Sequence, residues 1–192
     1  MRGVELRCEF ESHHDTASLN RLGIGWCARE QCWTFPLSDA THRIVGINRR
    51  YPNGTKRVIA GGRVGLYMPD GLDTVGRLLI AEGATDCAAL LDVGFTAVGR
   101  FSCATCTRDL IELTRRSQPA DVVIVADQGN PGRRGAHDLA TALTPFVLAL
   151  RTIAPPNEYA DARAWRQAGA THNDFIRTIE SAPVRRLGVS RG

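Results

Sequence analysis

Lysine is almost absent from this sequence. Of its 24 basic residues only Lys56 is a lysine, and 20 acidic residues leave a net charge of +4. Arginine forms planar, bidentate contacts with phosphate, so the composition is compatible with a nucleic-acid partner. The codon bias of a GC-rich genome explains the same excess more simply. Charge alone therefore excludes few classes of protein.

The sequence also has no long apolar run. No stretch approaches the roughly 18 residues that a membrane-spanning helix needs, and the first fifteen residues lack the apolar core of a signal peptide. We therefore expect a cytoplasmic protein without a membrane partner. Its 192 residues, 43% of them hydrophobic, suit one α/β domain with an extension, or two small domains.

The sequence has six cysteines, and without a secretory signal we expect them to be reduced. Cys103 and Cys106 form a C-x-x-C, and Cys27 and Cys32 form a looser pair. Four thiols could ligate zinc, but neither pair has the surroundings of a zinc ribbon or of a thioredoxin-like redox site. We expect neither zinc nor redox chemistry here.

The chain divides near residue 70, where Gly, Pro and Asp cluster in MPDGLDTVG. Residues 1–70 predict a short helix ending at Gly23 and then a basic, β-rich segment, with Asn53-Gly54 as a hairpin turn because both residues tolerate positive φ. Residues 71–183 alternate strands with helices, which predicts a parallel sheet. The helices include one that starts at Ser102. Residues 184–192 form a basic tail that we expect to be flexible.

Acidic residues follow the predicted parallel strands. Glu82 ends RLLIA, Asp127 ends DVVIVA, and Glu158 and Asp161 follow the last strand. The carboxyl ends of parallel strands share one edge of a sheet, where ligands usually bind. Carboxylates there suit Mg²⁺, which prefers oxygen ligands. The alternative is that they are ordinary loop acids after strands, and spacing alone does not decide between the two.

These segments resemble the TOPRIM domain of primases, especially phage and plasmid primases and primase–helicases. Glu82, Gly83 and Asp86 match its E-G-x-x-D motif, and Asp127 matches the first aspartate of its D-x-D motif. Gly132, Ala136, Leu139 and Ala140 match the helix that follows, and Glu158 and Asp161 resemble the late acidic pair. The three motifs cover about half of the chain, in the family's order.

The resemblance implies a function and a set of metal ligands. In the family such acids bind Mg²⁺ or Mn²⁺ for nucleotide polymerisation, so Glu82 and Asp127 are the expected catalytic residues, and Asp161 and Glu158 the expected further ligands. One departure stands out: Gly129 occupies the place of the second D-x-D aspartate. Glycine offers no side-chain ligand, so we expect weaker metal affinity.

Residues 26–70 look like the segment before TOPRIM in primases. Between His42 and Arg63 there is no acid, a pattern typical of a nucleic-acid track. Tyr51, Trp26 and Trp33 could stack on bases, but for the two tryptophans a core role is favoured. The expected nucleic-acid-binding residues are Arg43, Arg49, Arg50, Lys56, Arg57 and Arg63, with an exposed arginine face as the alternative.

Several other residues are candidates. Arg133 and Arg134 begin the helix after Asp127 and could bind nucleotide phosphates or simply face solvent. Asp86 could reach the metal through water, but a role at the start of its helix is favoured. His13 and His14, with Asp15, carry only a weak metal signal.

We therefore expect an α/β TOPRIM fold with a β-rich extension, and primase-type synthesis of RNA primers on single-stranded DNA from nucleoside triphosphates. Rival functions are a TOPRIM nuclease and a non-catalytic nucleic-acid-binding module. No zinc-binding template module or helicase motif is recognisable in the chain. A replicative helicase or a zinc-binding module on another chain is therefore an expected partner, unless the gene is truncated.

Overall fold

The computed structural model describes residues 16–187. His13, His14 and Asp15, and the end of the basic tail from residue 188, lie outside the described residues. Within them, nine strands form one sheet in the order β4-β3-β2-β5-β7-β6-β8-β9, with β1 paired to β2. No helix in this part of the chain has the length and apolarity to cross a membrane.

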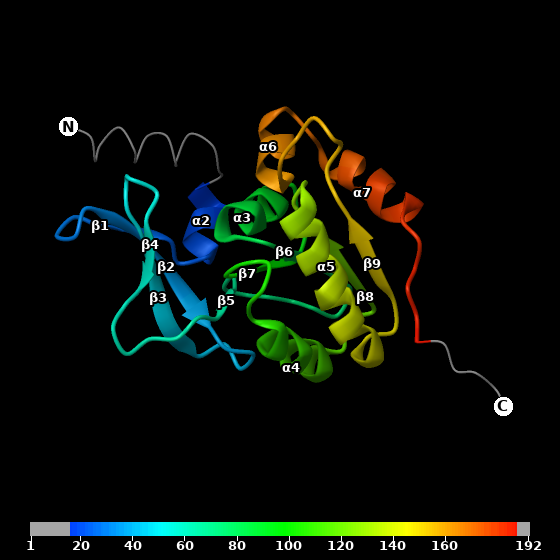
Figure 1. The fold of residues 1–192 in the computed structure, drawn as a ribbon, viewed down its shortest axis with the longest axis horizontal. Coiled ribbons are helices and arrows are strands. Elements are labelled where there is room, and N and C mark those ends of the chain that lie inside the picture. Colours follow the sequence, from blue (N-terminus) through cyan, green and yellow to red (C-terminus); the bar gives the residue numbers. More distant parts are fainter. Residues whose placement is uncertain (1–15, 188–192) are drawn as a thin grey trace.

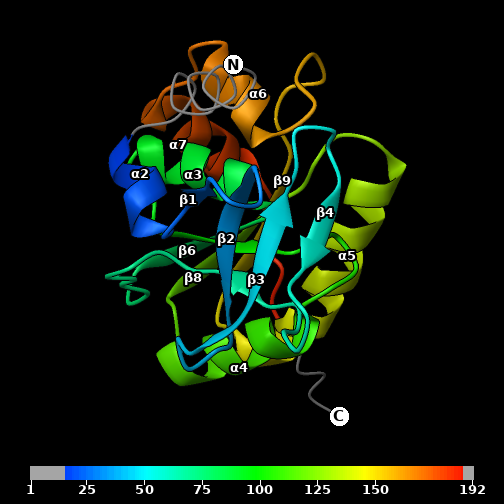
Figure 2. The same cartoon turned by 90° about the vertical axis from the view of Figure 1, so that its left-hand side faces the viewer.

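The first half of the sheet is antiparallel. Its elements are α2 (Thr16–Arg21), β1 (Gly25–Cys27), β2 (Cys32–Ser38), β3 (Ile44–Arg50), β4 (Lys56–Val58) and β5 (Leu66–Tyr67). Figure 2 looks onto β2, β3 and β4. The predicted hairpin turn joins β3 to β4, and Gly54 has φ +83°. Asn53 instead supports the turn with its side chain, whose Oδ1 accepts a hydrogen bond from the Thr55 amide at 3.0 Å.

The second half is parallel and alternates with helices, as predicted. It comprises β6 (Arg77–Ala81), α3 (Ala84–Asp92), β7 (Ala97–Arg100), α4 (Thr107–Ser117), β8 (Asp121–Val125), α5 (Asn130–Leu143), the 3₁₀ turn η1 (Thr144–Phe146), β9 (Leu150–Ile153), α6 (Ala162–Gln167) and α7 (His172–Ser181). Strands β7, β6, β8 and β9 run parallel. Strand β5 pairs antiparallel with both β2 and β7, and so joins the two halves (Figure 1). The α/β fold with a β-rich extension is confirmed, while the domain boundary near residue 70 stays a prediction.

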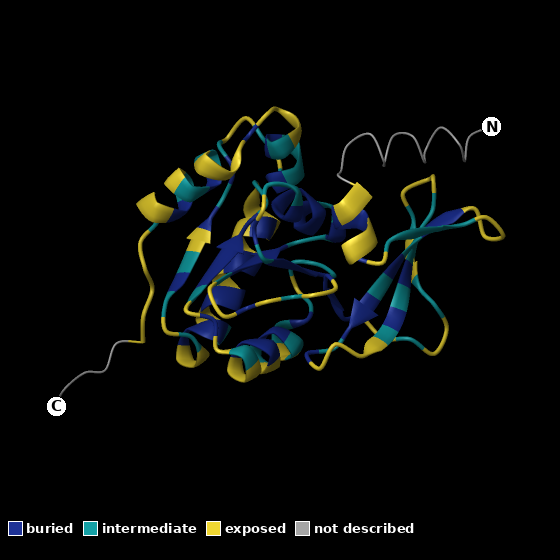
Figure 3. Cartoon of the chain, turned by 180° about the vertical axis from the view of Figure 1, so that it is seen from behind, coloured by how far each residue is buried: buried dark blue, intermediate teal, exposed yellow. Residues whose placement is uncertain are grey.

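Helices cover both faces of the parallel sheet. On one face Leu79 and Val123 pack into a core with α2, α3, α6 and α7. On the other face Leu78 and Ile124 pack with α4 and α5. Successive strand residues therefore point into different cores, which is why these strands read as continuous apolar runs. Figure 3 shows the buried strands between helices whose outer faces are exposed.

Two helices differ from expectation. Helix α4 begins at Thr107 rather than near Ser102, because Cys106 has φ +64° and this left-handed residue interrupts any helix from Ser102. Helix α7 was not predicted. Its signal is a capping box, in which Thr171 and Asp174 exchange side-chain to backbone hydrogen bonds at the helix start.

Candidate functional site

The carboxyl ends of the parallel strands bring three charged side chains to one edge of the sheet. Glu82 follows β6 directly, Asp127 lies two residues after β8, and Arg100 is the last residue of β7. The register places Ala81 beside Gly99 on the neighbouring strand. The structure thus brings Glu82 and Asp127 to the same edge, as their places after parallel strands predict.

A cavity of about 260 Å³ lies at this edge. Its acidic wall comes from the α/β half and consists of Glu82, Asp86, Asp127 and Asp161. The opposite wall, here called the basic wall, comes from the β-rich half and consists of the basic residues Arg50 and Lys56 with Phe35, Asn48 and Tyr67. Arg163 of α6 adds a cationic side chain from the α/β half. Carboxylates and cationic side chains therefore share one cleft, an arrangement able to hold a phosphorylated ligand together with a cation.

Two acids of the acidic wall are held by the start of α6. Asp161 caps this helix, and its Oδ1 accepts a hydrogen bond from the Ala164 amide at 2.7 Å. Its other oxygen lies 3.3 Å from the Arg163 guanidinium. Asp86 accepts a hydrogen bond from the Arg163 amide at 3.1 Å and is only 6% exposed. Burial and then the Asp161 charge raise the pKa of Asp86 to about 6.

Asp127 sits in a tight turn between β8 and α5. A Cβ on Gly132 would lie 2.6 Å from the Asp127 carbonyl oxygen, so only glycine permits this approach. Burial raises the pKa of Asp127 to about 7, with further contributions from Asp86, Glu82 and Asp161, while Arg100 opposes the shift. The clustered carboxylates thus repel one another, and a cation among them would relieve that repulsion.

Arg100 is a site residue that the sequence reading missed. Its side chain is 2% exposed, and its Nη2 lies 3.8 Å from Glu82 Oε2. An arginine at the end of a predicted strand usually extends to solvent, so the sequence carries no signal for its burial. It becomes recognisable only when β7 is placed beside β6.

The acidic wall matches a hard divalent cation in the chemistry of its donors but not in their number. Within residues 16–187, no group of three or more His, Cys, Asp or Glu side chains is arranged to hold a metal ion. Glu82 Oε2 is nevertheless buried without a hydrogen-bond partner. Mg²⁺ commonly uses one or two carboxylates and completes its coordination with water and phosphate oxygens. Glu82 and Asp127 fit that role.

Gly129 cannot present a ligand in this backbone conformation. It is exposed, and its φ of +96° and ψ of 164° are nearly restricted to glycine. Nothing lies within 4 Å of the position that a Cβ would occupy. The departure from D-x-D therefore involves the backbone as well as the missing carboxylate, because an aspartate at position 129 would be strained in this loop conformation.

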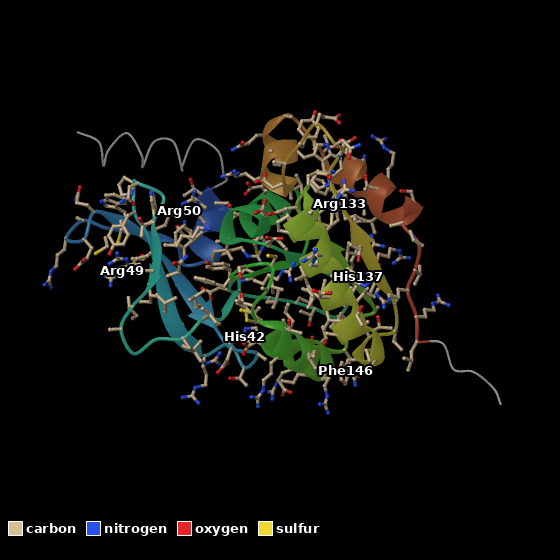
Figure 4. All side chains as sticks on the ribbon, viewed as in Figure 1. His42, Arg49, Arg50, Arg133, His137 and Phe146 are labelled. Atoms are coloured by element: carbon tan, nitrogen blue, oxygen red, sulfur yellow. The ribbon has the colours of Figure 1, made fainter. Side chains whose placement is uncertain are left out.

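Three predicted site residues lie away from this cavity. Glu158 is exposed and is not among the lining residues, because the turn before α6 directs only Asp161 toward the cleft. Arg133, labelled in Figure 4 at the start of α5, donates to Gln128 Oε1 at 2.6 Å. Arg134 lines a separate cavity of about 440 Å³ between α4 and α5. Phosphate binding by the two arginines stays a prediction.

The six basic residues of the β-rich segment separate into two groups. Arg50 and Lys56 line the cavity and pair directly across strands β3 and β4. Arg49 forms an ion pair with Glu30 at 3.2 Å, and Arg63 lies 3.5 Å from Asp109. Arg43 and Arg57 are exposed outside the cavity. Figure 4 shows Arg49 and Arg50 on the antiparallel strands.

Two of the tryptophans and two of the cysteines lie in the β1–β2 hairpin. Trp33 is 8% exposed, and the half-buried Trp26 packs edge-on against it with ring centroids 5.5 Å apart, as expected for core residues. The five cysteines in the described part of the chain are free thiols. Cys27 and Cys32 face each other across the β1–β2 hairpin.

Comparison with known proteins supports the fold assignment. No family model matches the chain, and no curated protein matches it in sequence. Among solved structures, the primase catalytic domain of DnaG bound to single-stranded DNA is 20% identical, with a TM-score of 0.71 over 95% of this chain and 72% of that one. The zinc-binding and RNA polymerase domains of Aquifex aeolicus primase are 13% identical, with a TM-score of 0.75 over 94% of this chain and 56% of that one.

A third similar structure comes from bacteriophage T7. It contains the primase domains of two gp4 subunits bound to an RNA/DNA hybrid and dTTP, with a lagging-strand DNA polymerase. The match is 13% identical, with a TM-score of 0.71 and coverage of 88% of each chain. The predicted resemblance to TOPRIM primases is thus confirmed in three dimensions: this chain has the fold of a primase catalytic core.

Proposed function

We propose that this chain is a primase-type nucleotidyltransferase, which extends a primer on single-stranded DNA from nucleoside triphosphates. The observation that carries the proposal is the shared cavity, where four carboxylates from the α/β half meet Arg50 and Lys56 from the β-rich half. Similar folds occur in proteins solved with single-stranded DNA, and with an RNA/DNA hybrid and dTTP.

Each wall has a separate task in this reaction. In nucleotidyl transfer a primer 3′-hydroxyl attacks the α-phosphate of the incoming nucleotide, the bond to the β-phosphate breaks, and pyrophosphate leaves, while negative charge develops on the phosphate oxygens. Arg50 and Lys56 orient the phosphates by charge-assisted hydrogen bonds. Glu82 and Asp127 would hold Mg²⁺ or Mn²⁺, which would offset charge on the reacting phosphate. Asp86 and Asp161 supply negative charge around these ligands.

Proton removal from the primer hydroxyl is a second requirement of the reaction. A general base works best when its pKa lies near the working pH. The Asp127 pKa of about 7 belongs to the metal-free chain, and a cation held by this carboxylate would lower it, so the proton would pass to solvent beside the cation. The exposed residues Arg43 and Arg57 extend positive charge along the β-rich half and would contact the template backbone.

A non-catalytic nucleic-acid-binding module is the second candidate. The glycine-restricted backbone at Gly129 favours it, because the D-x-D motif lacks one ligand. We further propose that a zinc-binding template module or a replicative helicase on another chain acts with this one.

One experiment separates the candidates. The full chain is incubated with single-stranded DNA, labelled ribonucleotides and Mg²⁺ or Mn²⁺, and both incorporation and DNA cleavage are measured. The primase proposal predicts template-dependent incorporation that Asp127→Asn abolishes while DNA binding persists. DNA binding without incorporation would favour the binding module, and cleavage of the template would favour a nuclease.

A further inference from the structure

The buried Arg100 side chain is the feature of the cavity that the proposed mechanism leaves unexplained. It is one of the largest fully buried side chains in the described residues. Burying a guanidinium is costly unless its donors and its charge are matched. The contacts of Arg100 therefore indicate what the protein obtains from this placement.

Two main-chain carbonyls anchor the guanidinium. Nη1 donates to the Cys103 carbonyl at 2.6 Å and to the Gly135 carbonyl at 3.2 Å. These carbonyls come from the loop after β7 and from α5. Gly135 allows the two segments to approach, because a Cβ there would lie 2.6 Å from the Cys103 carbonyl oxygen. The fold thus fixes the position of this cation from two directions.

The other terminal nitrogen faces the acidic wall. Nη2 lies 3.8 Å from Glu82 Oε2, and that oxygen is buried without a hydrogen-bond partner. The contact is electrostatic, since 3.8 Å exceeds normal hydrogen-bond length. Arg100 therefore restrains the buried oxygen of Glu82 by charge, while the rest of the side chain, which is 16% exposed, stays at the cavity and can contact another cation.

Cationic side chains offset the carboxylates of the cavity. Four carboxylates line it, and three cationic side chains, Arg50, Lys56 and Arg163, line it as well. Arg100 does not line the cavity, but it lies 3.8 Å from Glu82 and adds a fourth positive charge. The formal charges balance, and Gly129 contributes no further acid. The cavity should therefore attract divalent ions less strongly than four carboxylates without these cations would.

We propose that Arg100 is a positioning residue that acts as a built-in cation of the acidic wall: it restrains Glu82 and supplies positive charge that restricts the site to one weakly held divalent ion. The inference rests on the proposed function only in taking Glu82 and Asp127 as the ligands. It predicts that removing this charge strengthens metal binding, whereas a merely structural arginine would weaken binding when removed.

The test is a titration of the full chain with Mn²⁺, without DNA or nucleotide, followed by electron paramagnetic resonance of free Mn²⁺ at pH 8. We expect one bound ion in the wild type. Arg100→Gln should bind Mn²⁺ about tenfold more tightly, because one nearby positive charge is lost in a partly buried site. Arg100→Lys keeps the charge and should stay within about twofold of the wild type.

The matched control is Arg116→Gln, which removes an exposed arginine at the end of α4. It changes the net charge equally and should leave Mn²⁺ affinity unchanged. Thermal unfolding of each variant checks that it is folded. If Arg100→Gln does not fold, Arg100→Lys decides, because affinity reduced more than about fivefold would contradict a role through charge.

Unchanged or weaker Mn²⁺ binding in a folded Arg100→Gln variant would overturn the inference, as would two bound ions in the wild type. These outcomes are independent of primer synthesis. A chain that binds one Mn²⁺ as expected but makes no primers would contradict the proposed function and leave the role of Arg100 intact. Primer synthesis by the wild type, together with unchanged Mn²⁺ binding in Arg100→Gln, would support the proposed function and contradict the role of Arg100.

Discussion

The two walls of the cavity differ in how firmly the chain holds them. On the acidic wall, Asp86 and Asp161 accept hydrogen bonds from main-chain amides, and Glu82 is restrained by a buried arginine. On the basic wall, Arg50 and Lys56 form no ion pair with another residue of 16–187, and Lys56 is exposed. The acidic wall is preorganised, whereas the long cationic side chains can adapt to a ligand.

This difference assigns different consequences to mutation. A carboxylate that orients a cation must be held within a fraction of an ångström, so its loss removes the reaction. A flexible cation contributes attraction and partial orientation, so its loss weakens binding. Variants of the two walls should therefore separate into those that lose turnover and those that lose affinity.

The largest effect is expected on the acidic wall. Glu82→Gln and Asp127→Asn keep the shape of the side chain but remove a negative charge, and each should lower the rate of nucleotide incorporation by about a hundredfold or more. Single-turnover incorporation on single-stranded DNA measures this. Glu158→Gln is the matched control, because Glu158 is exposed outside the cavity. Equal losses in all three variants would refute the division between cavity and loop acids.

The second effect concerns the missing ligand of the acidic wall. Gly129→Asp restores the D-x-D pattern, but its φ of +96° lies where side chains are strained. We expect a loss of about 2 kcal/mol in the free energy of unfolding and no gain in Mn²⁺ affinity. Denaturant unfolding and Mn²⁺ titration measure the two. Gly71→Asn, at φ +66° in an open turn, is the control and should cost much less.

A smaller effect is expected on the basic wall. Arg50→Ala and Lys56→Ala should each raise the KM for nucleotide or weaken DNA binding about tenfold, the cost of one charge-assisted hydrogen bond, with a smaller change in turnover. Steady-state kinetics and fluorescence anisotropy at two salt concentrations measure this. Arg57→Ala removes an exposed charge of β4 outside the cavity and should change both less. If Arg57→Ala changed KM and DNA binding as much as Arg50→Ala does, the basic residues would act through their overall charge and not through contacts in the cavity.

The sequence predicts the acidic wall better than the basic wall. Glu82 and Asp127 follow apolar strands, and strand ends of a parallel sheet converge by geometry. The sequence does not show which of the six basic residues from His42 to Arg63 reach the cavity. Successive side chains of a strand point to opposite faces of the sheet, and the strand register decides which face meets the cavity. Arg50 and Lys56 do reach it, while Arg49 turns to Glu30.

The burial of Arg100 and the start of α4 were not predicted, for the same physical reason. Arg100 is buried through contacts with Cys103 and Gly135, which are close in space and not identifiable by spacing. The late start of α4 depends on the left-handed Cys106, a conformation that propensity disfavours for cysteine. Local patterns predict which elements form and where parallel strands end, but not the long-range contacts that select one side chain over its neighbour.

The smallest effect is a pH dependence confined to the acidic wall. The pKa of Asp127 is raised from 3.8 to about 7 by burial and neighbouring acids. Between these values the folded chain binds more protons than the unfolded chain, so the free energy of unfolding falls as pH rises. Allowing for partial solvent exposure, we expect a decrease of about 1–2 kcal/mol between pH 5 and pH 8 in the absence of metal.

Denaturant unfolding at both pH values in a chelator measures the decrease. Asp127→Asn should reduce it, because the amide mimics the protonated carboxyl at every pH, while Asp86, with a pKa of about 6, keeps part of the slope. Arg50→Ala on the basic wall should leave the decrease unchanged. Added Mg²⁺ should recover stability at pH 8 and little at pH 5, since a cation competes with protons for the same oxygens. A wild-type slope retained in Asp127→Asn would show that Asp127 does not carry the trend, and the acidic wall would then owe its pH dependence to Asp86, whose pKa is about 6.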